Sequence, residues 1–246
     1  RADTGLSAAA LAQSTGLSVD NTEALGALSD AAITEADIEA GRFDGAEVRA
    51  WLVNWQDVSV RWLQFRGSIG ELRRANGAFQ AELRGLTEAL NRPLGRIYQK
   101  PCTAVLGDAQ CRFNTATPEY FVDVTLEVGS EGVLFEWPDA GAFEPDWFRR
   151  GRLDVLSGAA AGLWGVIKDD ALEGGTRRVE LWQKLRVPLV AGDRVRVVAG
   201  CDKRTETCRL KFDNLVNFQG FPDIPGEDWV MSVPRADGVN TGGSLR

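Results

Sequence analysis

Short stretches of alternating apolar and polar residues, divided by glycine-rich turns, recur along most of the chain and restrict its fold more than any other feature. Val58, Val60 and Trp62 alternate in "VSVRWLQF", and "EYFVDVTLEVGSEGVLFEW" has the form strand, turn, strand. More short strands are indicated by "GRLDVLSG", "LWGVIKDDAL", "RRVELWQKL" and "DRVRVVAG". Strands of this length and spacing predict a mainly β protein built from barrels or sandwiches.

Local signals add detail to this β pattern. A break in the alternation after Trp62 predicts a bulge or a sheet crossing, and Asn76-Gly77 between two extended runs predicts a hairpin. A few short helices are also expected. One is capped by Thr34 in "ITEADIEAG", one lies in "LTEALNRP", and one has Thr205 as its N-cap.

The length of 246 residues suits one large β domain or two smaller ones, and the stretch from Glu136 to Trp147 interrupts the strands with two prolines. We therefore expect a β-rich domain over residues 1–140, a second over residues 141–235 that ends in a cysteine motif, and a flexible polar tail over residues 236–246. The chain opens abruptly without an initiator Met, so we also expect that its first residues are missing.

The charge of the chain bears on its partners. A formal net charge of -7 argues against a dedicated nucleic-acid binder, which would usually carry a basic surface. Between Asp20 and Glu47 stand eight acidic residues and one basic residue, Arg42. This run is either a solvated face or a surface that repels a polyanion. No apolar run approaches the ~20 residues that cross a bilayer, so no membrane-spanning segment is expected.

The residue types exclude much of enzyme chemistry. The chain has no histidine, which removes the common catalytic triads and mixed zinc sites. Asp169 and Asp170 are adjacent in a predicted strand and would point to opposite faces, so we expect a solvated turn or edge rather than a catalytic pair. Trp51, Trp55 and Trp62 could bind carbohydrate, but their spacing favours packing in a core or an interface.

Four cysteines form two widely separated pairs. Cys102 and Cys111 lie in "KPCTAVLGDAQCRF", and Cys201 and Cys208 lie in "GCDKRTETCRL". Two local disulfides would need an oxidising compartment, and structural zinc usually uses cysteines two to four residues apart. An iron–sulfur cluster tolerates wider gaps and needs four convergent thiolates. From the spacing alone, disulfides, zinc and a cluster all remain open.

Basic residues crowd both cysteine pairs and would offset the negative charge of a four-thiolate zinc or a four-iron centre. They are Lys100, Arg112, Lys203, Arg204, Arg209 and Lys211.

Three stretches resemble the hub proteins of gene transfer agents and their prophage relatives, which are tail baseplate proteins of siphophage-like particles. They are "VDNTEALGALSDAAITEADIEAGRFDGAEVRAWLVNW", "KPCTAVLGDAQCRF" and "GCDKRTETCRLKFDNLVNFQGFPDIPGED". The resemblance runs from about Leu17 to Asp228, and its most specific part is the last cysteine pair followed by "F-x-N" and "GFP-x-IPG".

This resemblance implies a structural protein and not an enzyme. Its two β domains would be related to tail-tube proteins and would assemble as a ring, typically a homotrimer. The ring would join the distal tail protein to the central or fibre protein, and DNA would pass through its lumen without specific binding. The expected location is the tail baseplate of a phage-like particle assembled in the bacterial cytoplasm.

The resemblance also bears on the cysteines. The tail-tip protein L of lambda-like phages, a more distant analogue, holds an iron–sulfur cluster on four cysteines. By that analogy Cys102, Cys111, Cys201 and Cys208 bind a cluster, most simply 4Fe-4S, with zinc as the alternative. The rival functions are a carboxylate-based hydrolase or a carbohydrate-binding baseplate module, with a structural zinc or disulfides.

Overall fold

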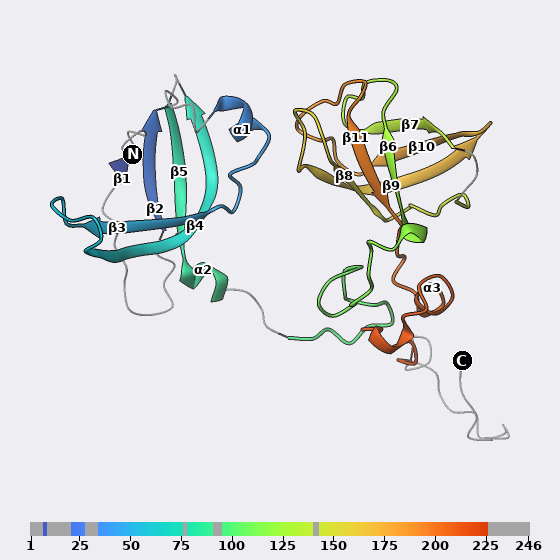
Figure 1. Ribbon diagram of the computed structural model, residues 1–246. Helices are drawn as coiled ribbons and strands as arrows, with labels where there is room; N and C mark the ends of the chain where they lie inside the picture. The colour runs from blue at the N-terminus through green and yellow to red at the C-terminus, as the bar shows by residue number, and fades with distance from the viewer. Residues whose placement is uncertain are drawn as a thin grey trace, which may run out of the picture. The chain divides into compact units, whose positions relative to one another are not determined.

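The computed structural model (Figure 1) describes residues 7–8, 21–27, 34–75, 78–90, 95–139 and 143–225. The chain divides into two compact units, Arg1–Gly95 and Arg96–Arg246. Both units are built around antiparallel sheets with a few short helices, so the predicted mainly β fold is confirmed. Within the described residues, no helix has the length and apolar character that a bilayer crossing requires.

The first unit holds a five-stranded sheet in the order β1-β2-β5-β4-β3. Its strands are β1 (Ser7–Ala8), β2 (Asn21–Ala27), β3 (Glu47–Val53), β4 (Arg61–Ala75) and β5 (Ala78–Gly85), and its helices are α1 (Glu35–Glu39) and α2 (Leu86–Leu90). Pairing of β4 with β5 continues to Ala75 and Ala78, which flank the predicted Asn76-Gly77 turn; that turn lies outside the described residues.

The predicted bulge is present in the β3–β4 hairpin. Ala50 pairs with Phe65 and Trp51 pairs with Leu63, which leaves Gln64 as the extra residue. The bulge lets Phe65 turn into the core of the first unit. There it packs with Ile38 of α1 and with residues of β5 (Phe79, Ala81, Leu83).

Packing of the three tryptophans of the β3–β4 hairpin in the core was a wrong prediction. Trp51, Trp55 and Trp62 are 41%, 84% and 72% exposed. The reason is the length of the β3–β4 hairpin. Strand β4 pairs with β5 only from Gly67 onward, so the outer part of the hairpin extends past β5. Packing in an interface stays a prediction.

The helix α1 begins as predicted. The Thr34 hydroxyl accepts the Asp37 backbone N–H at 3.1 Å and donates to the Asp37 carboxylate at 2.6 Å. Gly41, at φ 73°, follows the helix and ends it in a left-handed conformation that suits glycine.

The second unit holds a six-stranded antiparallel sheet in the order β6-β11-β8-β9-β10-β7. Its strands are β6 (Phe121–Thr125), β7 (Leu134–Pro138), β8 (Arg152–Val155), β9 (Trp164–Glu173), β10 (Thr176–Leu181) and β11 (Arg194–Val198). Short helical turns lie outside the sheet: η1 (Pro118–Tyr120), α3 (Thr205–Leu210) and η2 (Leu215–Asn217). The sheet curves around a core of alternating residues that includes Leu153, Val179, Val195 and Val197 (Figure 1).

The division between units differs from the predicted boundary near residue 140. The stretch Glu136 to Pro138 is part of β7, which pairs with β10 inside the second sheet. Pro138 therefore marks the end of an edge strand and not a linker, and Pro145 lies in the loop before β8. As a result, Cys102 and Cys111 belong to the second unit together with Cys201 and Cys208.

The prediction for the adjacent aspartates was half wrong. Asp169 and Asp170 do point to different environments, but Asp170 is 3% exposed rather than solvated. Its carboxylate accepts two hydrogen bonds from Arg177, at 2.8 and 2.9 Å, and the Phe148 backbone N–H. The arginine lies across the β9–β10 hairpin, a pairing that the local sequence did not reveal.

Two further predictions concern residues outside the described ranges: the polar tail over residues 236–246, and part of the acidic run, including Asp20 and Asp30.

Candidate metal centre

The cysteines lie on two irregular segments next to the second sheet. Cys102 and Cys111 precede the sheet in a stretch of turns, Cys201 follows β11, and Cys208 lies in α3. The two segments are joined directly, because the Cys102 backbone N–H donates to the Lys203 carbonyl at 2.9 Å. The fold therefore brings both pairs to the same end of the sheet.

Asp108 shapes the first segment. Its carboxylate accepts the backbone N–H groups of Cys111, Val105 and Gln110, at 2.6, 2.8 and 2.9 Å. These hydrogen bonds, the one from Cys111 above all, hold the pKa of Asp108 below its ordinary value. One ionised side chain thus folds the turn that presents Cys111.

The second segment is ordered by a short helix and a return turn. Helix α3 begins at Thr205 with Arg204 at its N-cap, one residue earlier than the cap that we predicted. After the helix, the Asn214 backbone N–H donates to the Cys208 carbonyl at 2.9 Å, and the Cys208 thiol donates to the Asn214 carbonyl at 3.3 Å. The chain therefore folds back over Cys208.

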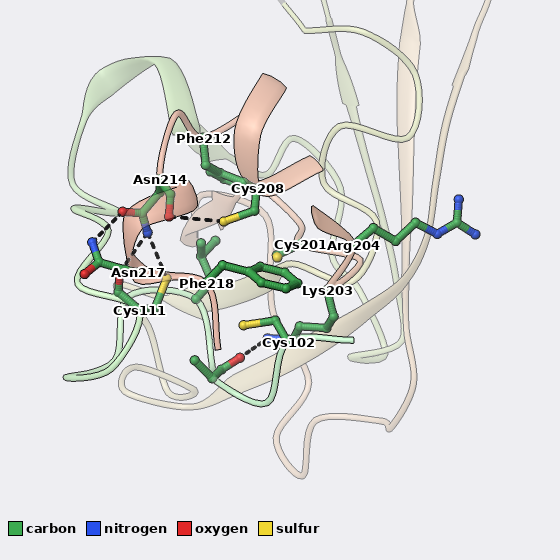
Figure 2. A pocket seen from close by; sticks show the side chains of 12 residues that line it. Cys102, Cys111, Cys201, Lys203, Arg204, Cys208, Phe212, Asn214, Asn217 and Phe218 are labelled. Atoms are coloured by element: carbon green, nitrogen blue, oxygen red, sulfur yellow. Dashed lines mark hydrogen bonds between the residues drawn. The ribbon is translucent and has the colours of Figure 1, made fainter. Parts of the chain in front are cut away.

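All four predicted residues line one small pocket. Figure 2 shows the sulfur atoms of Cys102, Cys111, Cys201 and Cys208 around a common space. The remaining walls come from Ala104, Leu106, Lys203, Arg204, Phe212, Asn214, Asn217 and Phe218. The space measures about 10 Å³, room for one water-sized sphere, so a four-iron cluster would need the thiols to swing outward.

The oxidation state of the four thiols separates the disulfide alternative from the two metal alternatives. The four cysteines all lie in the described part of the chain, and all are free, so neither local disulfide is formed. No group of three or more His, Cys, Asp or Glu side chains in the described ranges is arranged to hold a single metal ion. Four thiolates around one zinc would lie ~3.8 Å apart, given a Zn–S distance of about 2.3 Å. The four sulfurs therefore line one pocket, but they are not grouped as closely as the ligands of one zinc ion must be.

The pKa values of Cys201 and Cys208 also reflect the burial of these thiols and their closeness to the other cysteines. Burial raises the pKa of Cys208 to about 11, with smaller contributions from Cys201, Cys102 and Cys111. Burial also raises the pKa of Cys201. Thiolates in this pocket therefore need a compensating positive charge, which metal ions supply.

The basic residues surround the pocket less closely than predicted. Lys203 and Arg204 line it, but Arg204 extends away from the sulfurs in Figure 2. The Lys203 ammonium donates to the Ala104 carbonyl. The Lys211 ammonium donates to the carbonyls of Trp147 and Gly200, at 2.6 and 3.1 Å, and so ties α3 to the sheet.

Backbone and amide N–H groups near the sulfurs were missed by the sequence reasoning. The Asn214 side-chain amide donates to the Cys111 carbonyl at 2.7 Å and lies 3.5 Å from the Cys111 sulfur. The Gln219 backbone N–H lies 3.4 Å from the Cys102 sulfur. The only sequence signal was the asparagine-containing run "FDNLVNF", which begins four residues after Cys208.

The phenylalanines that follow Cys208 lie in two different places. Phe212 and Phe218 line the pocket. Phe221 instead packs against Tyr98, with ring centroids 4.8 Å apart, and lies under the Arg96 guanidinium at 4.7 Å.

Comparisons with known proteins match most of the chain. Residues 1–114 match the family "Baseplate hub protein, N-terminal attachment domain", and residues 146–228 match the family "Phage conserved hypothetical protein BR0599". The first cysteine pair falls inside the first match and the second pair inside the second. No curated protein sequence gives a significant match.

A solved structure gives a match over the full chain. It is described as "Virion of native gene transfer agent (GTA) particle", and one of its chains is 55% identical to this one with a TM-score of 0.89. The match covers 100% of this chain and 85% of that chain.

Proposed function

Because the chain belongs to the baseplate hub proteins of gene transfer agents and phage-like tails, we propose that it is a structural baseplate ring protein whose four cysteines hold one iron–sulfur cluster. The observation that carries the cluster is the convergence of four free thiols on one pocket from two distant segments. Four cysteine thiolates are the usual ligand set of such clusters.

The arrangement favours a cluster over a single zinc ion. The sulfurs surround a space without closing on one point, which disfavours a single ion, and a polynuclear centre would fit once the thiols swing outward. The N–H groups of Asn214 and Gln219 point at two of the sulfurs, and hydrogen bonds to sulfur are a common feature of iron–sulfur sites. When bound, the cluster would supply iron–thiolate bonds that link the two segments.

The centre would stabilise the second unit. The chain between Cys111 and Cys201, about ninety residues, contains all six strands of the second sheet. In the chain-entropy model, closing a loop of that length contributes on the order of 4 kcal/mol. Both pairs lie in one unit, so the link would close that unit and would not join the two units.

As a hub, the protein would form a homotrimeric ring that joins the distal tail protein to the central or fibre protein. DNA would pass through the lumen without specific binding. The described acidic residues of the run before β3, such as Glu35 and Glu39, are exposed and would repel phosphates if they face that lumen. Assembly would take place in the bacterial cytoplasm.

The cluster is tested on full-length protein purified without oxygen. We expect a brown protein that contains iron and acid-labile sulfide, and loss of both in Cys102→Ser, Cys111→Ser, Cys201→Ser and Cys208→Ser. Ala109→Ser is the matched control, because it adds a serine at an exposed position of the same turn. A colourless protein with one zinc per chain would support the zinc alternative and contradict the cluster.

The hub role is tested on particles. Particles made without this protein should have tails that lack an organised tip, as seen by electron microscopy. Intact tips in its absence would refute the role. Quantitative mass spectrometry of intact particles should give three copies per tail.

A further inference from the structure

The outer end of the β3–β4 hairpin is a two-stranded ribbon, which we call the terminal ribbon and define as Trp51–Leu63. Within it Trp51 pairs with Leu63, Leu52 with Trp62, and Val53 with Arg61. Among the described strands, none but β3 and β4 pairs in this segment, because β5 joins β4 only from Gly67 onward. Figure 1 shows the hairpin reaching past the other strands of its sheet. Two strands alone are marginally stable in water.

The terminal ribbon is strongly apolar and exposed. Trp55 is 84% exposed and Trp62 is 72% exposed, values far above those of a core residue. The large exposed apolar side chains of the ribbon are Trp51, Leu52, Val53, Trp55, Val58, Val60, Trp62 and Leu63. Contiguous exposed apolar patches of this kind mark interaction sites.

Both faces of the ribbon are apolar. Successive side chains of a strand point to opposite faces, so Trp51 and its partner Leu63 occupy one face. Leu52 and its partner Trp62 occupy the other. A flat surface could cover only one of these faces. A strand that is apolar on both faces requires contacts on both, so the matching surface is a cleft with two apolar walls.

The ribbon is organised before any partner binds. In its turn, the Asn54 backbone N–H donates to the Val60 carbonyl at 2.9 Å. Asp57 accepts the backbone N–H and the hydroxyl of Ser59, at 3.0 and 2.7 Å. The Arg61 guanidinium lies 4.9 Å above the Trp51 ring. A preformed element loses less conformational entropy on docking than a flexible loop does.

The charge of the ribbon indicates the chemistry of its partner. Asp57 and Arg61 are its only charged residues and they cancel, whereas the whole chain carries -7. A segment without net charge is complemented by an uncharged protein cleft. A segment that inserts into an anionic membrane surface would instead be expected to carry several lysines or arginines at its edge.

We propose that the terminal ribbon inserts into an uncharged, apolar cleft of a neighbouring subunit of the tail particle that is a different protein and not a second copy of the hub. This rests on the proposed hub function, because the ribbon lies in the region that matches the family of N-terminal attachment domains. Trp55 and Trp62, each with roughly 150–250 Å² to bury, together with the exposed part of Trp51 and five aliphatic side chains, approach the ~800 Å² that one partner contributes to a standard interface.

The test uses full-length hub in assembled particles. In the double variant Trp55→Ser/Trp62→Ser we expect at least a tenfold loss of hub from purified particles, measured by immunoblot against the major capsid protein. Trp182→Ser is the matched control, because Trp182 is 64% exposed in the second unit, and it should be incorporated normally. If the double variant is insoluble, Trp55→Ser alone carries the test.

Several outcomes would overturn the proposal. Normal incorporation of the double variant, or equal loss of the Trp182→Ser control, contradicts it. So does light scattering in which the purified hub is an oligomer that the double variant dissociates, because the occupant is then a second copy. Flotation of the hub with phosphatidylethanolamine–phosphatidylglycerol vesicles that requires the tryptophans would assign the ribbon to lipid.

Failure of the ribbon proposal is separable from failure of the hub role. Organised tips in particles without any hub contradict the hub role itself. Disorganised tips without the hub, combined with normal incorporation of the double variant, contradict only the ribbon proposal.

Discussion

At the scale of single residues, Arg177 is the largest fully buried side chain among the described residues. Its side chain is 0% exposed and contacts Asp170 and Asp139, and it also donates to the carbonyls of Phe143 and Glu144. The arginine therefore fixes the chain before β8 against the β9–β10 hairpin. Removing one partner of a buried ion pair leaves the other charge uncompensated.

We predict that Arg177→Met lowers the free energy of unfolding by about 3–5 kcal/mol. Arg178→Met is the control, because Arg178 is an exposed neighbour whose guanidinium lies 3.7 Å from Glu136, and such a pair contributes about 1 kcal/mol or less. Urea unfolding followed by tryptophan fluorescence measures both. Equal effects of the two substitutions would show that the buried pairs do not stabilise the unit.

Asn214 contacts both cysteine pairs. Its side-chain amide reaches Cys111 and its carbonyl accepts the Cys208 thiol. If a cluster is bound, Asn214→Ala should speed its loss to a chelator about tenfold, in line with other substitutions next to metal ligands. Stopped-flow bleaching of the visible absorption gives the rate, with Asn114→Ala in an exposed turn as the control. Unchanged kinetics would remove Asn214 from the site.

The sequence located the four cysteines but not the groups around them. Cysteine pairs stand out in a chain without histidine, because few other side chains can bind soft metals. Asn214 acts partly through its backbone carbonyl, and Gln219 acts through its backbone N–H. Every residue except proline carries those groups, so only the folded chain shows which ones face sulfur.

At the scale of elements, the end of β11 controls the position of Cys201. Gly200 lies so close to the preceding loop that a Cβ atom would stand 1.6 Å from the Arg149 carbonyl oxygen. Its backbone N–H donates to the Trp147 carbonyl at 2.9 Å. The strand can therefore lead into the cysteine segment only because this position has no side chain.

Gly200→Ala should destabilise the protein by about 1–3 kcal/mol or more, as overpacking does, and should reduce metal content per chain. Gly95→Ala is the control: nothing lies within 4 Å of its Cβ position, and alanine should be neutral or slightly stabilising there. Differential scanning calorimetry and iron analysis report the two effects. A fully stable, metal-loaded Gly200→Ala protein would contradict this account.

The elements themselves followed closely from the sequence, whereas their grouping did not. Alternation located the strands, and the parity break after Trp62 located the bulge at Gln64. Pro138 was misinterpreted as part of a linker, because an edge strand such as β7 tolerates proline at its end. Local sequence does not show which strands share a sheet.

At the scale of the whole molecule, the metal centre should act on one unit only. All four cysteines lie in Arg96–Arg246, and the loop that they close contains β6 to β11. We predict that removing the metal increases amide exchange in the second sheet and leaves β3, β4 and β5 of the first unit unchanged. Hydrogen-exchange mass spectrometry before and after chelation tests this. Equal deprotection of both sheets would contradict a local role.

The central claim is that the four thiols hold a cluster of several irons, and X-ray absorption at the iron edge of the anaerobically purified protein tests it most directly. We predict sulfur atoms in the first shell of iron and neighbouring iron atoms in the second, both absent from Cys208→Ser. A protein without iron that shows four sulfurs at about 2.3 Å around zinc would contradict the claim.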